Sequence, residues 1–208
     1  MRVNIFNYVM ASKPQETELD KIVYMMQFSQ ELCNRTQIYR QYLIWKGKKK
    51  SKKYKITRFP AFAPCAIFYD GKTKNDIVGM TDLCYLDIDD IKKDAMIREA
   101  MTKLCNDEHV LMASRSVSNN GLHILIRYQL KDVETPPQRV AIGIDEMEII
   151  YGEVFDLISK EYEQNLDMKI DKHSRHMEQL YIVSYDLDMY YNPNAVPIII
   201  DVKGAQTK

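Results

Sequence analysis

The spacing of apolar positions along the chain predicts strands that alternate with helices. Val3 and Ile5 alternate with polar residues in a first strand over residues 2–9. Apolar residues recur at helical spacing over about 15–32, 35–45, 94–104 and 138–165. Short β-favouring runs occupy residues 65–69, 81–90, 110–113, 122–128, 180–184 and 196–202, and a loose tail follows from residue 204. Because the strands at 110–113 and 122–128 have the pattern of hairpin partners, the chain is expected to form an α+β domain with a mixed or antiparallel central sheet flanked by helices.

One of these strands, in residues 81–90, ends in carboxylates. Side chains alternate between the two faces of a strand, so Asp87 and Asp89 point the same way, with Cα atoms about 6.5–7 Å apart. Two carboxylates at the end of a buried strand are costly unless a cation or hydrogen-bond donors neutralise them. The pair therefore predicts a site for one Mg²⁺ or for two bridged ions. The alternative is an acidic turn in which Asp89 or Asp90 caps a helix.

Composition narrows the class of protein. The 208 residues suffice for one large domain or two small ones, and a hydrophobic content of 46% supports a substantial core. The formal net charge is zero, so attraction to nucleic acid has to come from a local patch. Four widely spaced cysteines without a CxxC pair argue against zinc and for reduced thiols in a cytoplasmic protein. Residues 1–10 are too few and too polar for a signal peptide, and no segment approaches a membrane-spanning length.

A run of basic residues separates the N-terminal helices from the strands that follow. Residues 46–58 contain no acidic side chain, and the prolines at 60 and 64 fix an extended path directly afterwards. The run predicts a cationic loop that binds phosphate, in a nucleic acid or a triphosphate. A solvated loop without a ligand is the alternative. The residues expected to contact nucleic acid are Lys48, Lys49, Lys50, Lys52, Lys53, Lys55 and Arg58.

A second polar stretch, residues 114–121, is predicted to be a turn between two strands. Hydroxyl and amide groups at such a turn can donate hydrogen bonds to phosphate oxygens, so Ser116 and Ser118 are candidate nucleotide ligands. On the strand that follows, His123 shares a face with Arg127, and both are candidates for anion binding. The alternative for His123 is a structural histidine satisfied within the core.

A further carboxylate follows apolar residues near the end of the chain. Asp171 comes directly after Ile170, at the end of a segment that begins at residue 166. Its position makes it a candidate third metal ligand. An ordinary turn aspartate is the alternative.

Taken in order, these pieces resemble the archaeo-eukaryotic primase superfamily. The order is Leu-Asp-Ile-Asp at 86–89, a serine-rich turn ending in Gly-Leu-His at 121–123, Ile-Asp at 170–171 and Val-Ser-Tyr-Asp at 183–186. A Phe-Pro-Ala-Phe-Ala-Pro segment precedes them at 59–64. The resemblance is closest to the primase-polymerase-like branch known as the VirE N-terminal domain, which occurs on bacterial mobile elements and is often joined to a helicase.

The resemblance implies a role for each matched residue. Asp87 and Asp89 match the family's hydrophobic-Asp-x-Asp metal site, Asp171 matches its later acidic ligand, and His123 matches the histidine that contacts the nucleotide's phosphates. Together they imply nucleotidyl transfer with Mg²⁺ or Mn²⁺ in mobile-element replication, from nucleoside triphosphates to the 3′-hydroxyl of a primer or of a first nucleotide on a single-stranded DNA template. Two positions depart from the family pattern. Asn119 stands where the turn commonly has glycine, which asparagine's tolerance of positive φ accommodates, and Gln179 stands where an arginine is expected.

The resemblance also implies an RRM-like sheet joined to a smaller N-terminal α/β unit. Residues 1–208 are expected to form a single catalytic domain, with the N-terminal unit and its basic loop in residues 1–64 and the metal-binding sheet core in residues 65–203. A helicase domain or protein is the expected partner. Two other functions stay open: an inactive module that binds single-stranded DNA or nucleotide, and a metal-dependent phosphohydrolase or nuclease built on the same carboxylates.

Overall fold

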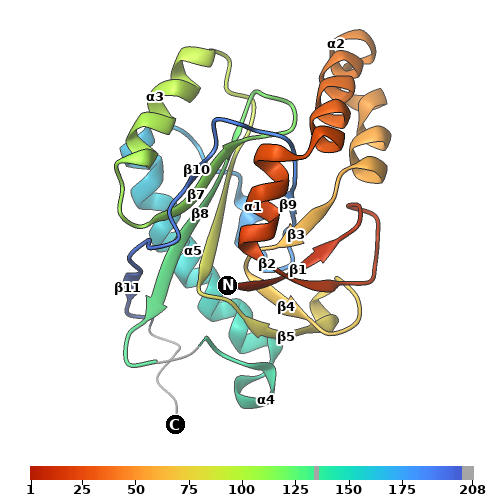
Figure 1. Ribbon diagram of the computed structural model, residues 1–208. Helices are drawn as coiled ribbons and strands as arrows, with labels where there is room; N and C mark the ends of the chain where they lie inside the picture. Colours follow the sequence, from red (N-terminus) through yellow and green to blue (C-terminus); the bar gives the residue numbers. More distant parts are fainter. Residues whose placement is uncertain (134–135, 203–208) are drawn as a thin grey trace.

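The structure, a computed structural model, describes residues 1–133 and 136–202. The predicted α+β fold is confirmed, with a mixed central sheet, a smaller antiparallel sheet and flanking helices (Figure 1). The tail predicted from residue 204 lies outside the described residues. Among the described helices, none has the length and apolar character that crossing a membrane requires.

The central sheet is built around one long strand, β8 (Leu122–Leu130). Both β6 (Leu83–Ile88) and β7 (Val110–Arg115) pair with it in antiparallel orientation, which confirms the predicted hairpin. β10 (Tyr190–Tyr191) extends the sheet beyond β7, and β11 (Ile198–Ile200) pairs with the end of β8 in parallel, so the sheet is mixed. The register of β6 and β8 places Asp87 directly opposite His123.

A second sheet joins the N-terminal strands to a late segment of the chain. Its order is β2 (Gln15–Glu18), β1 (Arg2–Phe6), β3 (Ala61–Ala63) and β9 (Tyr181–Ile182), with every pair antiparallel. The strand β9 follows the whole central sheet except β10 and β11, so the smaller sheet is not formed by residues 1–64 alone. A separate hairpin, β4 (Ala66–Phe68) and β5 (Ile77–Met80), encloses the 3₁₀ turn η1 (Lys74–Asp76).

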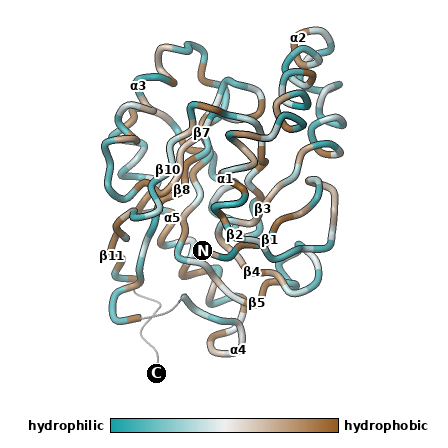
Figure 2. Tube along the Cα trace, in the orientation of Figure 1, coloured by the Kyte–Doolittle hydropathy of each residue, from teal (hydrophilic) through white to brown (hydrophobic). Residues whose placement is uncertain are grey.

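The strand β6 is covered on one face by the smaller sheet and on the other by helix α5 (Ile144–Leu166). On one face, the ring of Tyr181 from β9 lies 5.5 Å from the ring of Tyr85 and 4.7 Å from that of His123. On the other side, α5 lies behind the central sheet, and Tyr151 donates a hydrogen bond to the Ser174 carbonyl at 3.1 Å (Figure 1). Figure 2 shows apolar positions along the central strands, a largely hydrophilic α2 (Gln30–Arg58), and an α3 (Asp94–Cys105) in which apolar and polar positions are mixed. The short helix α4 (Arg139–Ile142) precedes α5.

The basic run is helical, so the prediction of a loop was wrong. After α1 (Leu19–Phe28), helix α2 runs from Gln30 to Arg58 and includes every lysine of the run. Lysine has a good helix propensity, and Pro60 is the first proline to interrupt the pattern. Tyr54 also stacks on Tyr39 and Tyr42, with ring centroids 6.3 and 6.0 Å apart. This apolar contact holds the basic segment in place while most of its lysines remain in solvent.

The helix expected from about residue 15 begins only at Leu19. Residues Gln15–Glu18 instead pair with β1, and Arg2 donates hydrogen bonds to Glu16 and Glu18 across the two strands. Pairing with a neighbouring strand therefore outweighs the helical spacing that the sequence shows at this point.

Helix α2 turns back on itself at Gly47. This residue has φ 73° and ψ 168°, a region that is essentially restricted to glycine. The hydroxyl of Ser51 donates a hydrogen bond to the Gly47 carbonyl at 2.9 Å, which closes the first turn of the second arm. We call residues 30–58, with arms 30–46 and 48–58, the α2 hairpin; its two arms lie side by side at the top right of Figure 1.

Replacing Gly47 by alanine should lower the free energy of unfolding by about 1–3 kcal/mol, because the backbone at this turn is unfavourable for a residue with a Cβ. The strain is purely conformational, since an added Cβ would meet no atom within 4 Å. Urea denaturation followed by circular dichroism measures the change. Lys49→Ala, an exposed substitution in the same hairpin, is the matched control and should stay within about 0.5 kcal/mol of wild type. Equal stability of the two variants would contradict the assigned role of Gly47.

Candidate metal centre

Three carboxylates converge at the end of β6. One oxygen from each of Asp87, Asp89 and Asp171 lies within 4.8 Å of the other two. Asp87 is the penultimate residue of β6 and Asp89 follows its last residue, so both side chains leave the strand on one face. The backbone brings in the third member, because the amide of Asp171 donates a hydrogen bond to the carbonyl oxygen of Asp87 at 2.8 Å. The structure thus brings together the three ligands that the sequence suggested.

The segment before Asp171 is held at both ends. Helix α5 ends at Leu166, and Asp167 then adopts a left-handed conformation that turns the chain back toward the sheet. The amide of Ile170, a buried residue, donates a hydrogen bond to Glu163 Oε1 at 2.9 Å. Asp171 then caps the 3₁₀ turn η2 (Lys172–Arg175) by accepting a hydrogen bond from the amide of His173 at 3.0 Å. These contacts fix the position of the Asp171 carboxylate relative to β6.

Among the three carboxylates, Asp87 is the one whose ionised form is clearly disfavoured by its surroundings. Burial raises the pKa of its carboxyl to about 7, and the charges of Asp89 and Asp171 act in the same direction, against a smaller opposing effect of Lys55. Its Oδ1 is buried and has no hydrogen-bond partner among the described residues. A buried carboxylate oxygen without a donor is unfavourable unless a cation or a ligand satisfies it.

His123 lies beside Asp87 in a buried environment lined by aromatic rings. Its Nε2 is 3.5 Å from Asp87 Oδ1, and its ring packs edge to face against Tyr85 and Tyr181. Burial lowers the pKa of the His123 imidazole to about 4, and the nearby charge of Asp89 only partly offsets this. The imidazole is therefore neutral at physiological pH, and its Nδ1 is also buried without a partner in the described part of the chain.

Asp171 differs from Asp87 because a histidine supports its charge. Burial alone would raise the pKa of Asp171, but hydrogen bonds from the amide and side chain of His173 outweigh it and leave the pKa below its usual value. The hydrogen bond to Asp171, at 2.9 Å, in turn raises the pKa of the exposed His173 ring. Asp171 and Asp87 are thus not equivalent, and the carboxyl of Asp171 ionises at the lower pH.

The serine-rich turn closes one side of the same site. The Ser116 and Ser118 hydroxyls are 3.1 Å apart, and Ser118 donates a hydrogen bond to Asn120 Oδ1 at 2.6 Å. The amide of Ile91 donates to the Asn120 carbonyl at 2.7 Å, which ties the turn to the segment after Asp89. The Val117 carbonyl accepts a hydrogen bond from Arg40 at 3.2 Å, so the α2 hairpin also holds the turn.

Two residues of the turn have backbone reasons for their identity. Asn119 adopts φ 63°, a left-handed conformation that asparagine tolerates better than most residues. At Gly121, an added Cβ would lie 2.4 Å from the carbonyl oxygen of Ile88. Glycine at this position therefore permits the turn to approach the end of β6.

The basic residues predicted to bind nucleic acid divide into two groups. Lys55 is half-buried beside the carboxylates, and burial lowers its pKa while Asp89 and Asp87 oppose that effect. Lys48 forms an ion pair of 3.2 Å with Asp90. The remaining members are exposed on the α2 hairpin, namely Lys49, Lys50, Lys52, Lys53 and Arg58.

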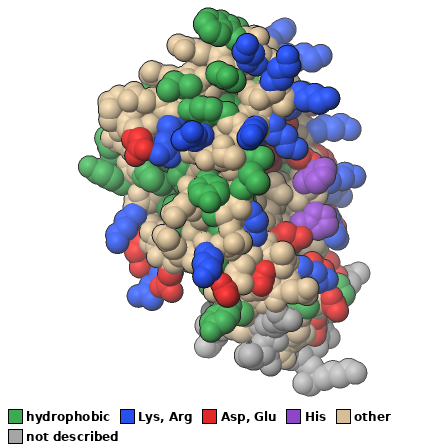
Figure 3. Space-filling model, turned by 90° about the vertical axis from the view of Figure 1, so that its right-hand side faces the viewer, with side chains coloured by type: hydrophobic (Ala, Val, Ile, Leu, Met, Phe, Trp, Pro, Cys, Tyr) green, Lys and Arg blue, Asp and Glu red, His purple; other side chains and the backbone are tan. Residues whose placement is uncertain are grey.

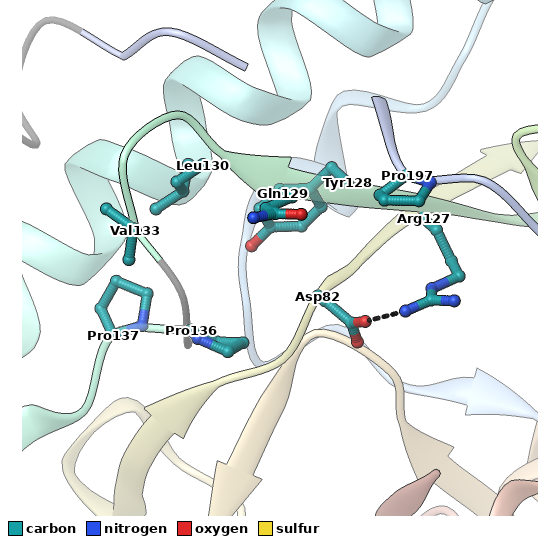
Figure 4. Close-up of a pocket in the computed structure, with 9 residues that line it drawn as sticks. All are labelled: Asp82, Arg127, Tyr128, Gln129, Leu130, Val133, Pro136, Pro137 and Pro197. Atoms are coloured by element: carbon teal, nitrogen blue, oxygen red, sulfur yellow. Dashed lines mark hydrogen bonds and ion pairs between the residues drawn. The ribbon is translucent and has the colours of Figure 1, made fainter. Parts of the chain in front are cut away.

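The structure does not bring Arg127 to the carboxylates. It lies four residues beyond His123 on β8, about 13 Å along an extended strand, and donates a hydrogen bond to Asp82 Oδ2 at 3.0 Å. It lines a different, proline-rich cavity with Asp82 and Pro197 (Figure 4). Sharing a strand face with His123 therefore did not place Arg127 in the same site. Arg175, an arginine four residues before Gln179, also does not reach the carboxylates and donates hydrogen bonds to both Asp156 oxygens.

A cavity of about 230 Å³ contains the carboxylates and their neighbours. Its lining includes the three aspartates, His123, both serines, Lys55, His173 and Gln179. Gln179, the residue at which an arginine was expected from the sequence, lines the same cavity. Within the described residues, this cavity combines carboxylates with hydroxyl, imidazole and ammonium groups.

The donor set fits a hard divalent cation. Mg²⁺ prefers carboxylate oxygens at about 2.0–2.1 Å, so two oxygens on one ion can lie at most about 4.2 Å apart. The observed separations of up to 4.8 Å are slightly wider than that span. The site therefore suits one ion after a small side-chain rotation, or two ions about 3.5–4 Å apart. The buried, unpartnered Oδ1 of Asp87 is the observation that most favours a cation here.

His173 was not among the residues predicted for the site. Its position two residues after Asp171 is the available signal, because a side chain at this spacing can reach back to a capping aspartate. The placement of Lys55 in the carboxylate cavity was also unexpected, since only the helical form of the basic run directs one lysine inward.

A family model described as "BT4734-like, N-terminal domain" matches residues 54–191 of the chain. The matched segment begins in the second arm of the α2 hairpin and ends in β10. It contains all three carboxylates, the serine-rich turn and His123. No curated protein and no solved structure matches the chain.

Replacing Asp87 by asparagine should stabilise the metal-free protein at pH 8 by up to about 4 kcal/mol. Because the folded-state pKa of Asp87 is raised to about 7, its contribution lowers the free energy of unfolding as pH rises from about 4 to about 7. His123 has a lowered pKa of about 4 and contributes the opposite trend, since folding is favoured as pH rises from about 4 to about 6.5. Denaturant titrations of the wild type and the variant at several pH values, with EDTA present, measure the free energy of unfolding and its dependence on pH.

Mn²⁺ should raise the melting temperature of the wild-type protein at pH 8, and the Asp87→Asn variant should lose that increase. Asp70→Asn, which neutralises an exposed aspartate, is the control and should retain that increase. A wild-type melting temperature that does not respond to Mn²⁺ or Mg²⁺ would argue against a metal site.

Proposed function

The chain belongs to the BT4734-like N-terminal domain family, and from its carboxylate site we propose that it is a metal-dependent nucleotidyltransferase of the primase-polymerase type. On this proposal it adds nucleotides on a single-stranded DNA template during replication of a mobile element, in the cytoplasm and together with a helicase domain or protein. The observation that carries the proposal is the convergence of Asp87, Asp89 and Asp171 in one cavity with His123 and the serine-rich turn.

The carboxylates would hold Mg²⁺ or Mn²⁺. A bound divalent ion supplies charge that lowers the pKa of an attacking hydroxyl and stabilises a pyrophosphate leaving group. Oxygen ligands are the type that both ions prefer. Asp171, whose charge His173 supports, would remain ionised at lower pH than Asp87.

The groups around the carboxylates are suited to a triphosphate. The neutral imidazole of His123 and the hydroxyls of Ser116 and Ser118 provide donors for phosphate oxygens without adding a buried charge. Lys55 adds the cationic group that lines the cavity near Asp87 and Asp89. Nε2 is the ring nitrogen that lies beside the carboxylates, 3.5 Å from Asp87 Oδ1, so the single N–H of the neutral ring would donate to a phosphate from this nitrogen.

A second candidate function is binding without catalysis. It is favoured by Gln179, which lines the cavity at the position where the resemblance expects a phosphate-binding arginine. A glutamine can donate a hydrogen bond but supplies no charge to a phosphate. On this alternative, the domain would hold single-stranded DNA or a nucleotide and leave synthesis to another protein.

Asp89→Asn should reduce primer extension with Mn²⁺ by at least about a hundredfold, because it removes a ligand to the ion. A primed single-stranded template, with both deoxynucleoside and ribonucleoside triphosphates, gives the assay its substrates. The control Asp70→Asn should extend at the wild-type rate. Extension by Asp89→Asn at that rate would remove the carboxylate from catalysis. Absence of extension by the wild type with either metal would favour the binding module, and degradation of the template would favour a nuclease.

Gln179→Arg should tighten binding of a nucleoside triphosphate by about tenfold, the value of one added charge-assisted hydrogen bond. Isothermal titration with Mn²⁺ and a non-hydrolysable triphosphate measures the affinity. Gln179→Glu has a side chain of the same length and the opposite charge, and it should weaken binding. Equal affinities of the two variants would show that position 179 does not contact the phosphates.

A further inference from the structure

The α2 hairpin exposes two large apolar side chains next to its turn. Ile44 and Trp45 are each 82% exposed, and they come directly before the basic run that begins at Lys46. Tyr42, one turn earlier, is 41% exposed. Figure 3 shows hydrophobic side chains beside a group of Lys and Arg at this end of the molecule. An exposed tryptophan without a binding partner is uncommon, because an indole ring in solvent does not gain the favourable free energy of burial.

The helical form of the basic run sorts its lysines into two faces. Lys48, Lys52 and Lys55 follow one another at i, i+4 and i+7, so they share one side of the second arm. Lys55 lies beside Asp87 and Asp89 and senses the charges of Lys48 and Lys52. Lys48 in turn contacts Asp90. The row therefore leads from the turn of the hairpin to the carboxylate cavity, over about 10 Å of helix.

The other lysines of the basic run lie outside this row. Lys46, Lys49, Lys50 and Lys53 are exposed, and residues 46–58 contain no acidic side chain. An apolar protein partner would offer no negative charge to these exposed lysines. A nucleic-acid strand supplies phosphates for the lysines and a π-face for the indole, so its chemistry matches both features.

We propose that the α2 hairpin binds single-stranded nucleic acid, with Trp45 stacking on an unpaired base and the Lys48–Lys52–Lys55 row guiding the backbone toward the carboxylate cavity. Stacking on Trp45 requires a base that is not enclosed in a duplex, which sets the preference for single strands. The row covers roughly three nucleotides at a stacked rise of about 3.4 Å. The direction toward the cavity rests on the proposed function, whereas the binding itself requires neither metal nor catalysis.

The chain contains a single tryptophan, so its fluorescence reports on this site alone. Adding an oligothymidylate in EDTA should quench the emission of Trp45 in the wild type and equally in the control Asp70→Asn. Anisotropy of a labelled oligothymidylate should show a loss of affinity of about tenfold in Trp45→Ala, as expected for one lost base stack. Ile44→Ala is the matched control, because Ile44 is equally exposed and adjacent but cannot stack, and its affinity should stay within about twofold of wild type.

Charge reversal tests the second half of the proposal. Lys52→Glu should weaken binding and reduce the dependence of affinity on salt, whereas a competing duplex of the same length should displace the oligothymidylate poorly. The proposal is overturned if the oligonucleotide leaves Trp45 fluorescence unchanged. It is also overturned if Ile44→Ala loses as much affinity as Trp45→Ala, or if duplex binds as tightly as single strand.

These outcomes separate the inference from the proposed function. Quenching with no nucleotide incorporation by the wild type would retain the strand-binding hairpin and reject the transferase. Incorporation that proceeds normally in Trp45→Ala, with unchanged oligonucleotide affinity, would retain the transferase and reject the hairpin. Circular dichroism of each variant should be unchanged, because both side chains are almost fully solvated.

Discussion

The three carboxylates of the site repel one another, and the site exists only because the fold holds them together against that repulsion. The backbone hydrogen bond between the Asp171 amide and the Asp87 carbonyl prevents the two side chains from separating without breaking the contact between η2 and β6. Asp87 Oδ1 is buried and has no hydrogen-bond donor within the described residues, so hydrogen bonds from the protein do not offset this repulsion. A fold that holds like charges together in this way retains an unfavourable arrangement, as sites for ligands commonly do.

The surrounding elements make that arrangement rigid. β8 supplies His123 in register with Asp87, and the close approach at Gly121 brings the serine-rich turn to the end of β6. The α2 hairpin fastens the same turn through Arg40 and places Lys55 in the cavity. Each contact comes from a different part of the chain, so the site forms only when both sheets and the hairpin have assembled.

The sequence was informative where a local rule decides the outcome. Alternation along β6 placed Asp87 and Asp89 together, and the tolerance of asparagine for positive φ anticipated the conformation of Asn119. It was less informative where tertiary contacts decide. The composition of the basic run indicated a loop, but the stacking of Tyr54 on the first arm keeps it helical. Arg127 shares a strand face with His123, yet the rise of the strand takes it out of reach and Asp82 binds it there. Nothing local to residues 181–182 indicates that they pair with β3 rather than with the central sheet.

The pairing of β9 with β3 has a consequence for where the chain can be divided. β3 lies between β1 and β9, and the segment shared with the family, residues 54–191, includes β3 and β9 but not β1 or β2. A fragment cut at those limits would leave one edge of β3 with free backbone donors and acceptors, and such an edge can pair with another copy of itself. A fragment ending before residue 181 would expose the other edge. Truncation at either place therefore risks self-association that says nothing of the intact chain, and the natural unit for expression contains both β1 and β9.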